Sequence, residues 1–195
     1  MGNSQTNKAL NRERMLVEAA GQIRDGGLDS LSVNKLMQSL DLTHGGFYGH
    51  FSSRSELLAK ALERALMDGE ARAVGDGRSP SYAGIVRSYL SRRHRDARKT
   101  GCAISALVSD AGRSEVEVRE IMSQYIERYI EELERSLGDD GDSRAIVALS
   151  ALIGAVTISR VVTDAKRADA IAGAVREHLL GFLSDEATSE KPAPA

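Results

Sequence analysis

The chain has 195 residues, of which 42% are hydrophobic and 28% charged, and its formal net charge is −2. This length and apolar content support one or two folded domains and exclude a globally disordered chain. A single cysteine, Cys102, excludes an internal disulfide and fits a reducing compartment. The N-terminal segment lacks the apolar stretch of a signal peptide, and no uncharged run reaches the roughly 20 residues of a membrane span. We therefore expect a cytoplasmic protein with no membrane partner.

Charge is distributed unevenly along the chain. Residues 1–100 hold 16 Lys and Arg against 11 Asp and Glu, whereas residues 101–195 hold 10 against 17. A basic front half and an acidic back half suit a nucleic-acid-binding part joined to a part that avoids nucleic acid. Chance unevenness between the two halves is the alternative explanation.

Apolar spacing predicts one helix after another, and no segment shows the sustained period-2 alternation of a strand. The expected fold class is all-α, with about nine helices. After a flexible polar tail over residues 1–8, the expected helices cover residues 11–24, 33–40, 44–49, 53–74, 82–96, 101–112, 115–137, 145–162 and 168–183.

Two domains are expected. The segment GDGRSP, Gly75 to Pro80, is the clearest break in the chain. It separates an N-terminal domain over residues 9–74 from a C-terminal helical domain over residues 80–184. Residues 185–195 are expected to be disordered, because they are polar and contain two prolines.

Capping and turn residues mark the starts of the N-terminal helices. Ser53 precedes the long helix and Glu56 stands at its third position, which is the arrangement of a capping box. Thr43 is placed to cap the short helix before it. Asp41 lies in the turn between the two short helices, where an Asp tolerates the left-handed conformation.

The helices over residues 33–40 and 44–49, with a tight turn between them, form a helix-turn-helix candidate that spans about residues 31–51. In this geometry the first helix braces against the DNA backbone, and the first residues of the second helix reach base edges in the major groove. The pattern therefore predicts a DNA-reading element near the N-terminus.

The residue types of the second helix suit this task. Thr43 and Tyr48 can offer hydroxyl groups to phosphates. Gly45 and Gly46 carry no side chain, so the helix can approach the groove floor closely. His44 has ring nitrogens that could contact a base edge or a phosphate.

Other kinds of site find less support in this stretch. A phosphate-binding loop would need G-x-x-x-x-G-K-[ST] or G-x-G-x-x-G after a strand, and neither pattern is present. His44 and His50 lie six residues apart, off a shared helical face and without a nearby cysteine, which disfavours a zinc site. Phe47 and Phe51 are expected in the core, and a purely structural role is the alternative for His50. We expect no metal, no cofactor, no catalytic residue and no enzymatic activity.

The run from Ser32 to Leu58, SVNKLMQSLDLTHGGFYGHFSSRSELL, resembles the DNA-binding domain of the TetR family of bacterial transcriptional repressors. The resemblance covers residues 9–74, and its specific part is a Y-x-[HY]-F core followed by a Ser-capped helix. This chain departs from the family pattern at Met37, where Ala is usual, and at Asp41, where Gly is frequent. Arg54 replaces the commoner Lys and keeps the charge.

The resemblance implies a transcriptional regulator, acting as a repressor, that binds a palindromic double-stranded DNA operator as a homodimer. It also implies release by an unknown small-molecule inducer. A helical protein–protein interaction module without DNA binding is the alternative. The expected DNA-binding residues are Ser32, Thr43, His44, Gly45, Gly46, Tyr48, His50 and Arg54.

A separate argument supports dimerisation. The helix expected over residues 145–162 is apolar around most of its circumference, and its small residues permit close approach of another helix. Together with the next helix it forms a hairpin, and two such hairpins related by a two-fold axis make a four-helix bundle. The alternative is that these helices form only the core of one chain.

Tyrosines at helical spacing in the C-terminal domain predict either core positions or a ligand cavity of mixed polarity. Cys102 begins a helix after the basic run over residues 92–99, conditions that favour a reactive thiolate. A sensor of oxidants or electrophiles and an inert cysteine are both compatible with this position. The expected ligand-pocket residues are Tyr82, Tyr89, Cys102, Met122, Tyr125 and Tyr129.

Overall fold

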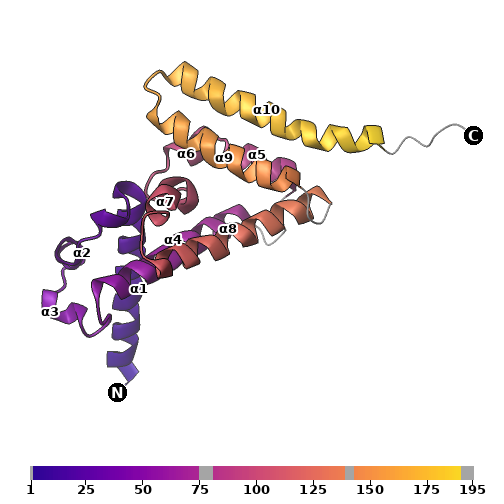
Figure 1. Ribbon diagram of the computed structural model, residues 1–195. Helices are drawn as coiled ribbons and strands as arrows, with labels where there is room; N and C mark the ends of the chain where they lie inside the picture. Colours follow the sequence, from indigo (N-terminus) through magenta and orange to yellow (C-terminus); the bar gives the residue numbers. More distant parts are fainter. Residues whose placement is uncertain (1, 75–80, 139–142, 190–195) are drawn as a thin grey trace, which may run out of the picture. The chain divides into compact units, whose positions relative to one another are not determined.

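The computed structural model describes residues 2–74, 81–138 and 143–189. Over these ranges the chain forms ten α-helices and one short 3-10 helix, without a strand (Figure 1). The all-α fold class predicted from the sequence is therefore confirmed.

The first five helical elements are α1 (Gly2–Gly26), η1 (Leu28–Ser30), α2 (Val33–Ser39), α3 (His44–Phe47) and α4 (Arg54–Val74). They are followed by α5 (Tyr82–Tyr89), α6 (Arg92–Asp96), α7 (Ala103–Ala111), α8 (Val116–Leu137), α9 (Ser143–Val161) and α10 (Ala165–Ser189).

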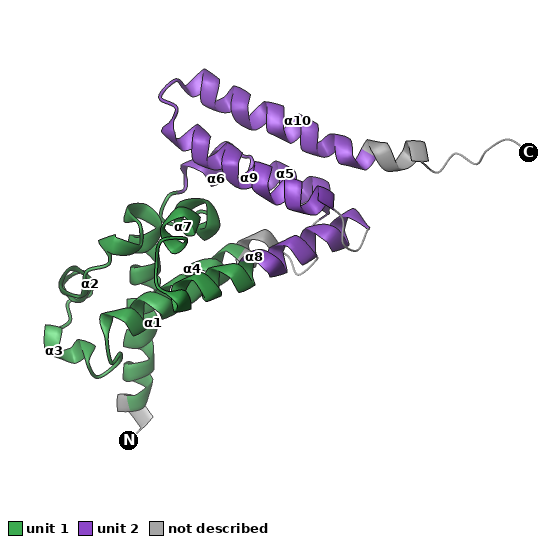
Figure 2. Cartoon of the chain, viewed as in Figure 1, with its two compact units in different colours: residues 1–72, 98–125 green, residues 73–97, 126–195 purple. Residues whose placement is uncertain are grey.

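The chain divides into two units that are each discontinuous in sequence (Figure 2). Unit 1 comprises residues 1–72 and 98–125, and unit 2 comprises residues 73–97 and 126–195. Unit 1 thus combines the helix-turn-helix region with α7 and the first part of α8. The break predicted at Gly75 to Pro80 lies outside the described residues.

Both terminal helices extend further than predicted. α1 begins at Gly2, although residues 1–8 were expected to form a flexible tail. α10 continues to Ser189, although disorder was expected from residue 185 onward. Neither extension contains a proline, and the first proline after Pro80 is Pro192, so no residue there stops a helix. Met1 and residues 190–195 lie outside the described part of the chain.

The helix predicted over residues 82–96 is interrupted at Ser91. The Ser91 hydroxyl accepts a hydrogen bond from the His94 N–H at 3.2 Å and donates one to the Ser88 carbonyl at 2.7 Å. A serine that bonds neighbouring backbone groups in this way competes with the continuous helix. It therefore ends α5 and caps α6.

The predicted capping box of α4 differs in detail, and α2 also begins with a serine cap. Ser32 accepts from the Lys35 N–H at 3.4 Å, and Ser53 accepts from the Glu56 N–H at 3.0 Å, so both serines are caps. The Glu56 carboxylate, however, receives the N–H and the hydroxyl of Ser52, each at 2.7 Å, one residue earlier than in a standard capping box. This shift ties the segment before α4 to its first turn.

The turn before α3 has the predicted backbone but not the predicted cap. Asp41 has a φ of 56°, which is the left-handed conformation. Thr43 occupies the N-cap position of α3, but its side chain makes no capping bond. The Thr43 carbonyl instead accepts from the Gly46 N–H at 2.9 Å, so this short helix closes through its backbone.

The core of unit 1 forms where α1, α2, α3 and α4 meet. The rings of Phe47 and Phe51 stack with centroids 5.8 Å apart and are 1% and 2% exposed, as predicted for core residues. The other large side chains that are fully buried in these helices are Met15, Ile23, Leu36, Met37, Leu57 and Leu62. Burial of each such side chain contributes roughly 1.5–3 kcal/mol, which fixes the place of α3 on the surface of this core.

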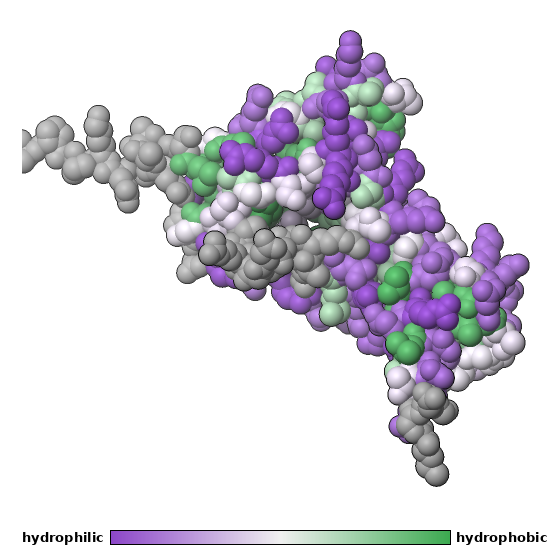
Figure 3. All heavy atoms as spheres, turned by 180° about the vertical axis from the view of Figure 1, so that it is seen from behind, coloured by the Kyte–Doolittle hydropathy of each residue, from purple (hydrophilic) through white to green (hydrophobic). Residues whose placement is uncertain are grey.

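In unit 2, α9 packs against α10, α5 and α6. It buries one side, which includes Ala148, Leu152 and Val156. The opposite side, here named the α9 apolar face, consists of Ile146, Val147, Ile158 and Val161, which are 50–77% exposed. Figure 3 shows apolar side chains at the surface of unit 2 on the side of the C-terminus.

By length and composition alone, α9 is apolar enough to cross a membrane, with a mean hydropathy of 1.6 over its most apolar window. The helix has 19 residues and contains Arg144 and Arg160, so its uncharged run stays shorter than the roughly 20 residues of a membrane span, as expected from the sequence. One such helix is weak evidence for a membrane span, because core helices of soluble proteins meet the same criterion.

Candidate nucleic-acid interface

The single turn of α3 presents two contrasting sides. Phe47 points into the core, whereas Thr43, His44, Gly45 and Gly46 are exposed. Packing of Phe47 thus fixes the helix in place and leaves its other side open to a partner.

The two glycines of α3 are not required by the packing of this chain. A Cβ atom added at Gly45 would meet no other atom within 4 Å. At Gly46 it would lie 3.4 Å from the Thr43 hydroxyl and 3.8 Å from the Met37 Cε, which are ordinary contacts. Both glycines have φ values in the helical range, since neither is among the residues with positive φ. The position beside Gly45 is therefore open, whereas a side chain at Gly46 would contact Met37 of the core.

Tyr48 is the most exposed aromatic side chain beside α3, with 65% of its surface accessible. Its ring stands edge-on to Phe47 at 5.2 Å and to His44 at 6.0 Å. Packing against Phe47 holds the ring in position at the surface. An exposed phenol held in this way is suited to donate its hydroxyl to a phosphate oxygen.

His50 lies at the edge of the core, where its Nδ1 atom is buried and has no hydrogen-bond partner among the described residues. Burial lowers the pKa of His50 below its usual 6.5, and the positive charges of Lys8 and Arg12 lower it further. The imidazole is therefore neutral at pH 7.

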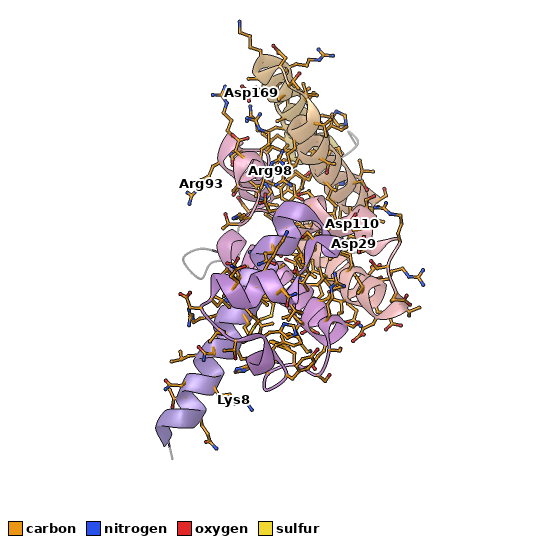
Figure 4. The ribbon with its side chains drawn as sticks, turned by 90° about the vertical axis from the view of Figure 1, so that its left-hand side faces the viewer. Lys8, Asp29, Arg93, Arg98, Asp110 and Asp169 are labelled. Carbon is orange, nitrogen blue, oxygen red and sulfur yellow. The ribbon has the colours of Figure 1, made fainter. Side chains whose placement is uncertain are left out.

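Two positively charged side chains that lower the pKa of His50 were not predicted as site residues. Lys8 and Arg12 are four residues apart on α1, so they lie on one side of the helix, close enough to lower the pKa of His50. Figure 4 shows Lys8 near the N-terminal end of α1. The sequence contains the i, i+4 spacing of Lys8 and Arg12. Residues 1–8 were expected to form a flexible tail, however, so the pair was not recognised.

Arg12 is also held by the core. Its guanidinium lies 4.5 Å above the centre of the Phe51 ring, and one nitrogen is 3.9 Å from the Glu56 carboxylate. A guanidinium over an aromatic face is attracted by the ring quadrupole. This contact positions a positive charge at the surface next to α3.

Arg54, expected to contact a phosphate, is engaged with the protein backbone. Its Nε donates to the Leu31 carbonyl at 3.0 Å, and one terminal nitrogen lies 3.4 Å from the carbonyls of Leu28 and Asp29. Arg54 therefore secures the η1 turn that leads into α2. Ser32 follows the same turn and caps α2, as described above.

Asp110 of α7 holds the same turn from the other side. Its carboxylate accepts from the Leu28 N–H at 3.1 Å, and Figure 4 shows Asp110 beside Asp29. Gly27, just before Leu28, has a φ of 85°, and a Cβ there would approach the Asp110 carboxylate to 2.6 Å. The turn that positions α2 is thus fixed by α4 and α7 together, a contact that sequence analysis missed.

The predicted ligand-pocket residues are distributed over both units. Cys102, Met122 and Tyr125 belong to unit 1, and Tyr82, Tyr89 and Tyr129 belong to unit 2. Tyr89 and Tyr129 lie together, with ring centroids 6.4 Å apart, and Tyr82 stacks on Phe182 at 6.5 Å.

Of the predicted pocket residues in unit 1, Met122 and Tyr125 are buried. Cys102 is a half-buried free cysteine at the N-cap of α7. Across the described ranges, His, Cys, Asp and Glu form no group of three or more that could hold a metal ion.

Comparison with known proteins places these features in a family context. Residues 15–61 match the family described as bacterial regulatory proteins, tetR family. Two proteins from different strains of Mycobacterium tuberculosis, both described as uncharacterized HTH-type transcriptional regulators, are 27% identical over 192 residues, which covers 89% of this chain and 96% of each relative.

Solved structures share the fold at lower identity. A TetR transcriptional regulator from Chloroflexus aurantiacus has a TM-score of 0.78 at 19% identity, covering 92% of this chain and 96% of that one. The reduced form of Escherichia coli NemR has a TM-score of 0.71 at 18% identity, covering 86% of this chain and 94% of that one. The helical arrangement is therefore shared over nearly the full length.

Proposed function

Because the chain is a transcriptional regulator of the TetR family with a helix-turn-helix DNA-binding domain, we propose that α3 enters the major groove of its operator. The observation that carries this proposal is the exposed side of α3, where two glycines leave space that the chain itself does not need. His44 is exposed at the start of the helix and would read a base edge or a phosphate.

We assign the phosphate contacts to side chains that flank α3. Tyr48 would donate its hydroxyl to one phosphate, while Lys8 and Arg12 would supply positive charge beside it. A neutral His50 can donate or accept a hydrogen bond, depending on its tautomer. Ser32 and Thr43 remain proposed phosphate contacts, and Arg54 would support the interface mainly by holding the η1 turn.

The regulator would bind a palindromic operator as a homodimer, with the α9 apolar face and α10 forming a two-fold interface between chains. Isologous interfaces of this kind place two identical heads on two half-sites. We further propose that it acts in the cytoplasm as a repressor, and that a small-molecule inducer releases it from DNA.

The inducer site is proposed near the tyrosines of the C-terminal region. The residues are Tyr82, Tyr89, Cys102, Met122, Tyr125 and Tyr129. An inducer that binds more tightly to a form with a different spacing of the two heads would lower DNA affinity by the same coupling free energy. α4 connects the helix-turn-helix to the C-terminal region and would carry this change.

Salt dependence of DNA affinity tests the proposed interface. Binding of the purified protein to a duplex from its own upstream region should weaken as salt rises. If Lys8 neutralises one phosphate, Lys8→Gln should reduce the slope of log K against log salt by about 0.9 and weaken binding to different sequences alike. Fluorescence anisotropy over a series of salt concentrations measures both quantities.

Lys166→Gln on α10 is the matched control, because it removes the same charge outside the proposed interface. Its salt slope should equal that of the wild type. Tyr48→Phe should weaken binding without changing the charge. A wild-type protein without salt-dependent affinity for duplex DNA would support the protein–protein interaction module instead.

A further inference from the structure

Unit 2 contains a cavity of about 190 Å³ that none of the predicted ligand-pocket residues lines. Leu90 and Val156 provide apolar walls. The side chains of α6 and α10 provide charges, namely those of Arg92, Arg95, Asp169 and Arg176.

The charges in this lining are unequal, because it contains three guanidinium groups and one carboxylate. Asp169 accepts hydrogen bonds from the Arg92 Nε at 3.1 Å and from an Arg95 terminal nitrogen at 2.9 Å. Arg95 has a second partner in Asp96, which lies outside the lining. Within the described part of the chain, no ion pair includes Arg176.

The Asp169 carboxylate is itself an oxyanion, and two arginines of the lining already bind it. Two guanidinium groups from one turn of α6 converge on its carboxylate, while Arg93, between them in the sequence, points away from Asp169 (Figure 4). The two arginines are already held by Asp169, so an incoming anion would not have to order them. The pKa of Asp169 is lowered by Arg92 and Arg95, so the aspartate stays ionised and keeps them in place.

We propose that this cavity binds the carboxylate or phosphate group of a small organic anion, with Arg176, Arg92 and Arg95 as its ligands. Guanidinium groups recognise both oxyanions through paired N–H donors. The apolar walls would contact the carbon skeleton. The volume lies below the roughly 300–1,000 Å³ of sites for drug-sized molecules, which restricts the occupant to a small metabolite.

Isothermal titration of the full chain with succinate and with inorganic phosphate, at constant ionic strength, tests this site without DNA. Saturable binding of one molecule per chain is expected for at least one probe. The probe that binds identifies the class of ligand, a carboxylate or a phosphate. Succinamide, which has the size of succinate but no charge, should not bind.

Paired variants locate the binding. Arg176→Gln and Arg92→Gln should each weaken it by about tenfold or more. Arg167→Gln on α10 and Arg93→Gln on α6 remove the same charge from exposed positions outside the lining, and should bind like the wild type. Circular dichroism of all four variants establishes that they are folded.

Two results would overturn the proposal. One is the absence of saturable binding for both probes. The other is equal weakening in the lining variants and in their controls, because it would indicate general attraction of anions to a basic surface. Either result leaves the proposed DNA interface untouched, since that interface lies in unit 1.

Discussion

At the scale of single residues, binding of a partner explains the glycines of α3 better than folding does. A glycine inside a helix is less favourable than alanine by roughly 0.5–1 kcal/mol. The chain has room for a methyl group at Gly45, so folding alone does not explain its presence.

Gly45→Ala should therefore weaken DNA binding without destabilising the fold. The free energy of unfolding should stay the same or rise by up to about 1 kcal/mol. Operator binding should weaken by about 1–3 kcal/mol, the range for the disruption of one base pair's recognition. Urea unfolding and fluorescence anisotropy measure the two quantities, and unchanged affinity would place Gly45 outside the groove.

His94 makes stability depend on pH. Its Nδ1 lies 2.7 Å from the Tyr89 carbonyl, which can only accept, so this nitrogen carries the proton of the neutral ring. Burial lowers the pKa of His94; the bond to Tyr89 opposes this effect, and the charge of Arg160 adds to it. The unfolded chain therefore takes up a proton at a higher pH than the folded chain.

The stability contributed by a neutral His94 is complete above pH 6.5 and is lost as the pH falls from there through the lowered pKa. His94→Asn keeps an N–H donor near the Tyr89 carbonyl but does not titrate. The variant should lose less stability than the wild type between about pH 7.5 and about pH 5.5. Urea unfolding at both pH values measures this, and equal losses would contradict the assignment.

The residues that sequence analysis identified and those that it missed differ in the range of their contacts. Ser53 and Asp41 carry local signals, because a cap or a turn involves residues only three or four positions away. By contrast, Asp110 binds a residue 82 positions away. Nothing in the local sequence around Asp110 indicates that partner, so this contact required the fold.

At the scale of elements, the η1 turn connects the helix-turn-helix to the rest of unit 1. It is held by Arg54 from α4 and by Asp110 from α7.

The difference between regular sequence patterns and single contacts also explains how closely the helix bounds were predicted. α8 was predicted within one residue because its apolar stripe is regular, whereas the interruption at Ser91 depends on a single hydroxyl that can also occur inside a helix.

Asp110→Ala should reduce the free energy of unfolding by about 1–3 kcal/mol, because it leaves the N–H of the buried Leu28 without an acceptor. Asp110→Asn keeps an acceptor oxygen and should cost less. Arg113→Ala removes an exposed ion pair with Asp110 and an exposed hydrogen bond to the Ser109 hydroxyl, and should cost at most about 1 kcal/mol. Chemical unfolding ranks the three variants, and equal losses for Asp110→Ala and Arg113→Ala would argue against the turn contact.

At the scale of the whole molecule, the α9 apolar face is the surface proposed to join two chains. Ile158→Glu, at a position 54% exposed, should convert a dimer into a monomer and lower operator affinity, because the two half-sites would no longer be bound together. Analytical ultracentrifugation measures the assembly state. Val116→Glu, 55% exposed at the start of α8, is the matched control and should remain dimeric.

Arg24 has a consequence for the modularity of this regulator. Its buried guanidinium binds the Ala65 carbonyl and Asp68 of α4 at 3.1 and 3.3 Å, and the Lys99 carbonyl at 2.6 Å. The last of these partners comes from the segment before α7, and Asp110, which binds the Leu28 N–H, comes from α7 itself. A chimaera that transplants only residues 1–74 onto another effector region would lose two acceptors. The Arg24 guanidinium would lack the Lys99 carbonyl, and the Leu28 N–H would lack the Asp110 carboxylate. A DNA-binding module of this protein that is to be transferred therefore has to include residues 98–125 as well.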